Sequence, residues 1–327
     1  MRPRSLSGIK PTGMPHLGNY LGMIRPAIEL QETHDAFYFV ADYHALTTER
    51  SAADLRRHSH AIAAAFLALG LDPDRSTLYR QCDVPEVVEL AWILGCVVNM
   101  GFLERAHVYK AAQERGEANL LPVATFYYPV LMAADILVVD SDVVPVGKDQ
   151  LQHVEMAQDM AQRLNAIYGE VLKRPEPLVR QEVETVVGTD GRKMSKSYDN
   201  TIPLFLPPKA LRAAIMGIVT DSLPLEAPKD PDASCIFRLY RLFARSDEAE
   251  AMAGRFRAGG YGYSHAKQAL LEVLERELGP ARARYEELMA ASGELERVLS
   301  TGAARVRTIA REVVRRVRER VGLPALP

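Results

Sequence analysis

The spacing of hydrophobic and polar positions divides the chain into two parts that predict different structures. Up to about residue 185, short apolar runs alternate with helix-length segments whose apolar positions recur with a period near 3.6 residues. The clearest short run is AFYFVAD at residues 36–42, a pattern typical of a strand buried on both faces. Alternation of this kind predicts an α/β fold, a Rossmann-type parallel sheet with helices on both of its faces.

The pattern changes after residue 197. Prolines punctuate the chain, strand patterns end, and residues 264–292 and 303–321 read as long amphipathic helices. This texture predicts an all-helical C-terminal domain. We therefore expect a Rossmann catalytic domain at residues 1–190, a mobile loop at 191–202 and a helical domain at 203–327.

Composition and charge narrow the class of protein. The 327 residues carry a net charge of -2 with 25% charged residues, so a general positive field for nucleic acid is absent and RNA binding would need a local patch. The apolar runs are too short to span a bilayer. The three cysteines, Cys82, Cys96 and Cys235, are far apart, which argues against a zinc site or disulfide framework and favours a cytoplasmic location.

Two segments of the first 200 residues carry groups suited to polyphosphate. After the first predicted strand, PHLGN at 15–19 places Gly18 where backbone can approach a nucleotide, with His16 and Asn19 as donors at a helix start. KMSKS at 193–197 brings two ammonium groups and two hydroxyls. Each segment alone also fits a plainer interpretation, a turn with a capping asparagine or a solvated surface turn.

Together, in this order and about 175 residues apart, these segments resemble the two signature motifs of class I aminoacyl-tRNA synthetases. The similarity extends over essentially the whole chain and is to the bacterial tryptophanyl-tRNA synthetases. It is carried by residues 7–13, 42–45, 128–137, 144–153 and 261–263. The resemblance implies activation of L-tryptophan by ATP, transfer to tRNA(Trp), and a homodimer.

The resemblance also implies which residues hold ATP. Catalysis in this family needs no covalent enzyme intermediate, because positioning and charge stabilisation on the phosphates suffice. We expect Mg²⁺ to arrive with ATP, without a metal ligand from the protein. The expected catalytic residues are His16, Asn19, Lys193 and Lys196. The expected ATP-binding residues are Lys10, Pro11, Thr12, Gly18, Asn19, Gly147, Lys148, Asp149, Val186, Lys193, Met194, Ser195, Lys196 and Ser197.

Asp135 is the residue that indicates which amino acid the protein selects. It lies in an otherwise apolar helix, where a carboxylate is costly unless a donor meets it. It either pairs with a donor of the chain or accepts the indole N–H of tryptophan, and the resemblance favours the second. Leu6 stands where related tyrosyl enzymes place a tyrosine hydroxyl, which favours tryptophan over tyrosine. The other implied tryptophan-binding residues are His44, Tyr128, Met132, Val144, Val146 and Gln150.

The last predicted helix is rich in arginine. Its arginines either bind the phosphates of a folded RNA or form a solvated charged face. The resemblance favours tRNA, with Arg311, Arg315 and Arg318 as the expected contacts. Trp92, on an apolar helix, is expected in the core or at an interface.

Two departures from the family pattern concern the active site. Ala112 stands where the family commonly has a second lysine after Lys110, and Tyr43 stands where glutamine usually precedes His44. Catalytic efficiency is therefore open, as is the choice between a housekeeping and an auxiliary enzyme. Two rival functions also stay open: a small-molecule adenylyltransferase, which would not need the helical second half, and a paralogue that binds tryptophan or tRNA without joining them.

Overall fold

A five-stranded parallel sheet forms the centre of the molecule. The computed structural model describes residues 2–147, 150–179 and 185–325. The strand order is β3-β2-β1-β4-β5 and every neighbouring pair is parallel. The strands are β1 (Arg4–Ile9), β2 (Asp35–Val40), β3 (Thr77–Arg80), β4 (Val143–Val146) and β5 (Glu176–Val179). The predicted Rossmann-type α/β class is confirmed.

The strand β2 shows why the sheet forms. It pairs with β1 along its whole length, from Arg4 with Asp35 to Ile9 with Val40. Successive side chains of a strand point to opposite faces, and Tyr38 and Val40 enter one buried cluster while Phe37 and Phe39 enter the other. The run that predicted a strand buried on both faces has that structure.

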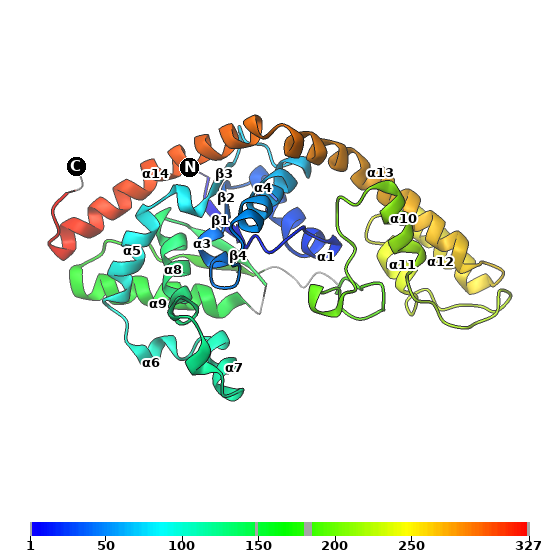
Figure 1. Cartoon of the computed structure of the whole chain (residues 1–327), viewed down its shortest axis with the longest axis horizontal. Helices are drawn as coiled ribbons and strands as arrows, with labels where there is room; N and C mark the ends of the chain where they lie inside the picture. Colours follow the sequence, from blue (N-terminus) through cyan, green and yellow to red (C-terminus); the bar gives the residue numbers. More distant parts are fainter. Residues whose placement is uncertain (1, 148–149, 180–184, 326–327) are drawn as a thin grey trace.

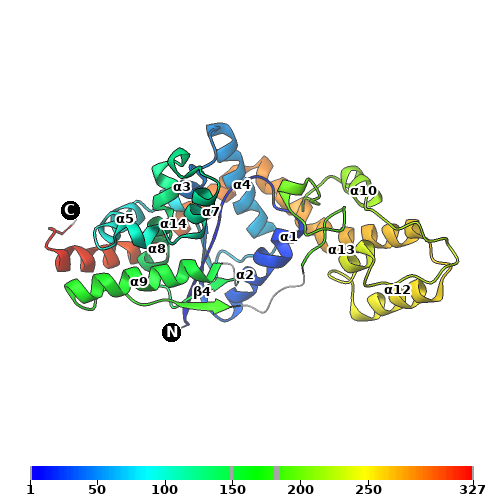
Figure 2. The same ribbon diagram turned by 90° about the horizontal axis from the view of Figure 1, so that it is seen from below.

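Helices cover both faces of the sheet (Figures 1 and 2). On the Tyr38 face lie α1 (Leu17–Asn19), α2 (Arg25–Glu29) and α4 (Ala52–Ala68). On the Phe37 face lie α5 (Glu86–Gly95), α8 (Val123–Val138) and α9 (Leu151–Tyr168). The short helix α3 (Asp42–Ala45) follows β2, and the short helices α6 (Met100–Leu103) and α7 (His107–Glu114) lie in the chain between α5 and α8. None of the helices in the described segments is long and apolar enough to cross a membrane.

The second half of the chain is helical, as predicted. It contains α10 (Pro208–Met216), α11 (Cys235–Tyr240), α12 (Ser246–Ala258), α13 (Tyr263–Ala290) and α14 (Ser292–Val321). Its core continues without a break into the Tyr38 face of the sheet. Phe205, just after the predicted loop, stacks on Tyr285 of α13 with ring centroids 4.2 Å apart.

The last helix packs on the sheet-containing half as well as following the helical half in the chain. A break at Ala291 separates α13 from α14, and α14 continues the arch of α13 along the sheet-containing half (Figure 1). Val306, Val313 and Val317 of α14 are fully buried in the same core as α5 and α8. Because β3 is an edge strand, α14 covers an edge that would otherwise present unpaired backbone groups.

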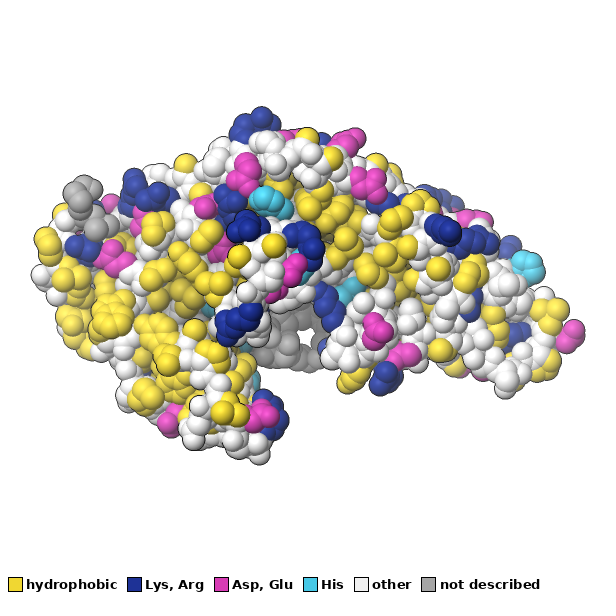
Figure 3. Space-filling model, viewed as in Figure 1, with side chains coloured by type: hydrophobic (Ala, Val, Ile, Leu, Met, Phe, Trp, Pro, Cys, Tyr) yellow, Lys and Arg dark blue, Asp and Glu magenta, His cyan; other side chains and the backbone are white. Residues whose placement is uncertain are grey.

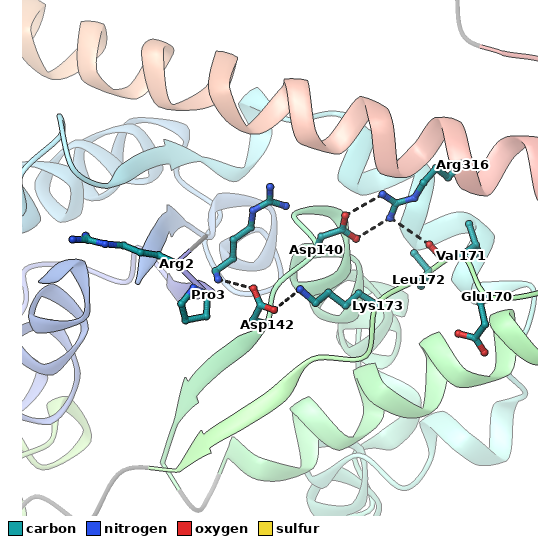
Figure 4. A pocket seen from close by; sticks show the side chains of 10 residues that line it. Arg2, Pro3, Asp140, Asp142, Glu170, Val171, Leu172, Lys173 and Arg316 are labelled. Carbon is teal, nitrogen blue, oxygen red and sulfur yellow. Dashed lines mark hydrogen bonds and ion pairs between the residues drawn. The ribbon is translucent and has the colours of Figure 1, made fainter. Parts of the chain in front are cut away.

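The arginines of α14 form ion pairs with the sheet-containing half. Glu86 accepts from both Arg307 (3.1 Å) and Arg311 (3.2 Å), and Arg318 pairs with Glu89. Arg316 forms a bidentate ion pair with Asp140 and donates to the carbonyl of Val171 (Figure 4). These residues line a cavity of about 600 Å³ at the amino ends of β1 and β4. Arg305 similarly reaches Asp35 (2.6 Å). These contacts fasten the helix to the sheet.

Candidate active site

A cavity of about 1370 Å³ opens at the carboxyl ends of the strands. Residues that follow β1, β2 and β4 line it, which is where open α/β sheets bind ligands. Its size suits an amino acid and a nucleotide side by side. Of the predicted ATP-binding and tryptophan-binding residues that the structure describes, all but Pro11 and Ser197 line this one cavity, and Pro11 is buried. Lys148 and Asp149 lie outside the described residues.

One end of the cavity is built around Asp135. This carboxylate on α8 is 1% exposed. His44 Nε2 lies 2.9 Å from Oδ2, and Gln81 Nε2 donates to Oδ1 (2.8 Å) and Oδ2 (2.9 Å). Burial raises the pKa of Asp135, and the contacts from His44 and Gln81 act against this rise. Donors of the chain therefore satisfy Asp135, which is the first of the two alternatives. Asp135 also lines the cavity, so contact with a tryptophan N–H stays a prediction.

The predicted partners of Asp135 surround the same end. Met132, one turn before Asp135 on α8, lines the cavity with Val144 and Val146 of β4 and with Gln150. Tyr128 lies a further turn back; its ring meets the edges of His44 and His153, and burial raises its pKa to about 12. Within the described chain the Tyr128 hydroxyl is buried without a hydrogen-bond partner. A neutral hydroxyl is therefore available to a ligand.

Gln81 is a residue that the sequence predictions missed. It directly follows β3, is fully buried and contacts Asp135, 54 residues later in the chain. The available signal was its place at the carboxyl end of a predicted strand, the edge of the sheet where ligand sites form.

The other end of the cavity contains the first phosphate motif. His16 and Asn19 cap each other: the Asn19 backbone N–H donates to His16 Nδ1, and the His16 backbone N–H donates to Asn19 Oδ1. Because Nδ1 accepts, Nε2 carries the ring proton and can donate to an oxygen anion. Burial lowers the pKa of His16 to about 4, and the charge of Lys196 acts in the same direction. His16 is therefore a neutral donor at pH 7.

A side chain at Gly18 would be crowded within this motif. A Cβ on Gly18 would lie 3.0 Å from the His16 ring and 3.6 Å from the Cβ of Met194. Gly18 therefore lies close to the KMSKS segment. The backbone N–H of Leu17 also donates to the carbonyl of Ile202, and that of Leu204 to the carbonyl of Pro15. These bonds join the first motif to the residues that follow the KMSKS segment.

Lysines complete the phosphate end. Lys196 Nζ donates to the carbonyl of Thr12 (2.8 Å), beside the Gly13 turn, whose φ of +107° favours glycine. Lys10 Nζ donates to Thr47 Oγ1 (3.0 Å). Burial lowers the pKa of both lysines. Lys193 and Ser195 line the same end, and Val186 is held by a bond from the Met194 N–H to its carbonyl.

Asn200 holds the KMSKS segment in place and was also missed. It is 1% exposed; its Oδ1 accepts from the Ser195 backbone N–H (2.8 Å), and its Nδ2 donates to Asp190 (2.7 Å) and to the Lys193 carbonyl (3.1 Å). The asparagine thus bridges the start and end of the loop. The available sequence signal was an asparagine at the end of the loop that begins with the turn at Gly191, since asparagine is common in turns.

The donor set at the phosphate end suits anions more than a metal ion. The described residues lining that end supply lysine, histidine, hydroxyl and amide groups, whereas Mg²⁺ prefers carboxylate and water oxygens. A magnesium ion bound there would be carried by the phosphate oxygens of the nucleotide, with these cations around it.

The two departures from the family pattern have distinct structural settings. Ala112 is fully buried on α7, so a lysine could not take that position in this conformation without moving the helix. Tyr43 contributes its backbone: its N–H donates to Gln81 Oε1 (3.1 Å), next to the Asp135 contact.

The arginines predicted to bind tRNA are engaged within the chain. Arg311 pairs with Glu86, Arg318 pairs with Glu89, and Arg315 pairs with Glu312 (2.7 Å) and Glu319 on its own helix. Only 14% of the Arg318 side chain is exposed. The side chains of Arg311 and Arg315 are 62% and 47% exposed, so contact of these two arginines with tRNA stays a prediction.

Comparison with known proteins bears on identity. A family model described as tRNA synthetases class I (W and Y) matches residues 1–279. The tryptophan–tRNA ligase of Rhodopirellula baltica is 49% identical over 98% of this chain and 99% of its own length; that of Pseudomonas aeruginosa is 49% identical over 100% of this chain and 75% of its own length. A crystal structure of tryptophanyl-tRNA synthetase from Campylobacter jejuni, complexed with ADP and tryptophan, matches with a TM-score of 0.92 and 45% identity, covering 98% of this chain and 100% of that one. The chain belongs to the class I tRNA synthetases for tryptophan and tyrosine, and within them to the bacterial tryptophanyl-tRNA synthetases.

Proposed function

We propose that this protein is a tryptophan–tRNA ligase, which forms tryptophanyl-adenylate from L-tryptophan and ATP and transfers the aminoacyl group to tRNA(Trp). The observation that carries the proposal is a single cavity with a buried, donor-oriented carboxylate at one end and a lysine and histidine cluster at the other. The two ends match the indole N–H of tryptophan and the phosphates of ATP.

In the first half-reaction the tryptophan carboxylate attacks the α-phosphorus of ATP in line, and pyrophosphate leaves. No side chain forms a bond to the substrate, so the protein contributes positioning and charge. His16 Nε2–H donates to a phosphate oxygen, and Lys193 and Lys196 balance the charge that grows on the pyrophosphate. ATP brings the magnesium ion, which supplies further charge on the phosphates.

Selection of tryptophan rests on the Asp135 end. An ionised carboxylate only accepts hydrogen bonds, and the indole ring has one polar group, a donor. Leu6 of β1, which is 2% exposed, lines the same end and offers no hydroxyl for a phenol. Tyrosine would therefore bring a polar hydroxyl to an apolar wall and lose affinity.

The second half-reaction needs a surface for tRNA, and we place it on the helical half formed by α10 to α13. The exposed Arg311 and Arg315 of α14 can add to this surface, while other arginines of α14 form ion pairs with the sheet-containing half. Affinity for tRNA should fall with rising salt, because phosphate contacts release counterions.

A homodimer is supported by an exposed apolar face. Val88 and Trp92 lie one turn apart on α5, and Trp92 is 73% exposed; Met100 of α6 and Val123 at the start of α8 are also exposed. Figure 3 shows hydrophobic side chains gathered over the part of the molecule where α5 and α6 lie in Figure 1. Apolar surface of this kind marks a protein–protein contact, so of the two predicted places for Trp92 we propose the interface.

The deciding experiment is amino-acid-dependent exchange of pyrophosphate into ATP, followed by charging of tRNA. We expect exchange with L-tryptophan and charging of tRNA(Trp). Exchange with L-tyrosine and not with L-tryptophan would identify the protein as a tyrosine-activating enzyme. Exchange with tryptophan but no charging would favour the paralogue or adenylyltransferase alternatives, and no exchange at all would refute the proposal.

A further inference from the structure

We propose that Gln81 positions the Asp135 carboxylate for the indole N–H and is thereby a specificity-determining residue, an inference that rests on the proposed function. One amide nitrogen of Gln81 donates to both oxygens of Asp135, at 2.8 and 2.9 Å. The glutamine is 0% exposed, so these bonds are shielded from water. Hydrogen bonds to a charged group contribute most to stability in such buried surroundings.

The orientation of the Gln81 amide is set by the backbone. Its Oε1 accepts from the backbone N–H of Tyr43 (3.1 Å), so its amino group must face Asp135. The same Tyr43 N–H reaches Asp42 Oδ1 (2.9 Å), which also accepts from the N–H of Cys82 (3.0 Å). The ends of β2 and β3 thus fix the glutamine, and the glutamine fixes the carboxylate.

This arrangement determines what Asp135 can accept. A carboxylate has about four lone-pair positions. Gln81 and His44 occupy some of them and hold its plane, while the side chain still lines the cavity. Removing the amide would leave the carboxylate free to rotate. It would also raise the pKa of Asp135 further, because the Gln81 hydrogen bond favours the ionised form. A protonated acid is a poorer acceptor for an indole N–H.

The first test compares two amino acids on Gln81→Met, which keeps the length of the side chain and removes its donors. L-Tryptophan and L-3-(benzothiophen-3-yl)alanine differ in one ring group, an N–H replaced by sulfur. We expect Gln81→Met to weaken binding of tryptophan by about tenfold to a hundredfold. Binding of the sulfur analogue should weaken by less than about threefold, because sulfur donates no hydrogen bond to Asp135. The matched control is Gln158→Met, a buried glutamine of α9 that donates to the Pro175 carbonyl.

The second test uses Gln81→Glu and pH. At high pH the new carboxylate faces Asp135 as a like charge, so tryptophan binding is weakest there and recovers as the pH falls and a shared proton bridges the two acids. Gln81→Met should behave oppositely, with its greatest loss at low pH, where Asp135 takes up a proton. The pH profile of each variant is divided by that of the wild type, because other titratable groups lie around Asp135. These groups are His44 of α3, Tyr79 of β3, Tyr128 of α8, His153 of α9, and Asp42 and Cys82 on the far side of the Gln81 amide.

Three results would overturn the role of Gln81. They are equal losses for tryptophan and the sulfur analogue, pH slopes of the same sign in both variants, and unchanged tryptophan binding. If Gln81→Met does not fold, the slope of Gln81→Glu decides alone. Tryptophan-dependent exchange by the wild type tests the proposed function separately, so its presence together with any of these results removes only the assignment to Gln81.

Discussion

The ammonium group of Lys196 donates a 2.8 Å hydrogen bond to the carbonyl oxygen of Thr12, although 184 residues separate them in the sequence. The bond closes the KMSKS segment onto the first loop. We propose that a phosphate oxygen of bound ATP replaces this carbonyl as the partner of Lys196, since charge-assisted hydrogen bonds are the stronger.

Lys196→Ala should separate catalysis from amino-acid binding. The ammonium lies at the phosphate end of the cavity, away from Asp135, so its loss removes charge stabilisation from the transition state. We expect the rate of pyrophosphate exchange to fall by about 10²–10³-fold, with the Kd for tryptophan changed by less than about twofold. Lys209→Ala, an exposed lysine of α10, is the control. Parallel losses in rate and in tryptophan affinity would contradict this role.

His16 should make stability depend on pH. Its pKa is about 4 in the folded protein, below the usual value of about 6.5. Between these values the unfolded chain binds a proton that the folded protein excludes, so the free energy of unfolding falls as the pH is lowered from 6.5 towards 4. We expect wild type to lose about 2 kcal/mol more than His16→Asn between pH 7 and pH 5.

Urea unfolding of both proteins at the two pH values measures this difference. Asparagine suits the variant because it retains a capping group at the helix start. A gap between wild type and variant that stays constant with pH would show that His16 is not held neutral by the fold.

Gly302 should be indispensable to the packing of α14. A Cβ at this position would lie 2.0 Å from the carbonyl oxygen of Leu78, a backbone atom of β3 that cannot rotate away. We expect Gly302→Ala to destabilise the protein by about 1–3 kcal/mol. Gly254→Ala, on α12 with nothing within 4 Å of the added carbon, should stabilise by about 0.5–1 kcal/mol. Thermal unfolding of the pair measures both, and similar shifts would exclude the steric explanation.

The sequence predicts the fold and most of the described site because those features are local. The apolar run around Phe37 predicts a buried strand by itself. A carboxylate such as Asp135 in an apolar helix needs a hydrogen-bond donor nearby. Gln81 could not be assigned as that donor, since a polar residue after a strand is common and its partner is 54 residues distant.

The ion-pair partners of the α14 arginines are a second feature that the sequence does not predict. Their positive charge is visible in composition, but Glu86, Glu89 and Asp140, which offset it, are remote in sequence and become neighbours only when the helix crosses the sheet. Charge counted along one helix therefore does not predict the field at its surface.

Trp92 should report directly on the proposed homodimer, because it is the one tryptophan of the sequence. Its ring is 73% exposed in a single chain, so dimerisation through α5 would bury it and shift its fluorescence to shorter wavelength. We expect the emission maximum of the substrate-free protein to move to longer wavelength on dilution. Light scattering should give twice the 36.3 kDa of one chain at high concentration.

Trp92→Glu should then be monomeric, since a carboxylate at the centre of an apolar contact loses its hydration without gaining a partner. Leu223→Glu is the matched control, because Leu223 is also exposed and apolar but lies in the helical half. It should keep the wild-type mass and dilution profile. A Trp92→Glu protein that still has twice the mass of one chain would move the contact away from α5, and a wild type that is monomeric throughout would leave its apolar face without a second copy.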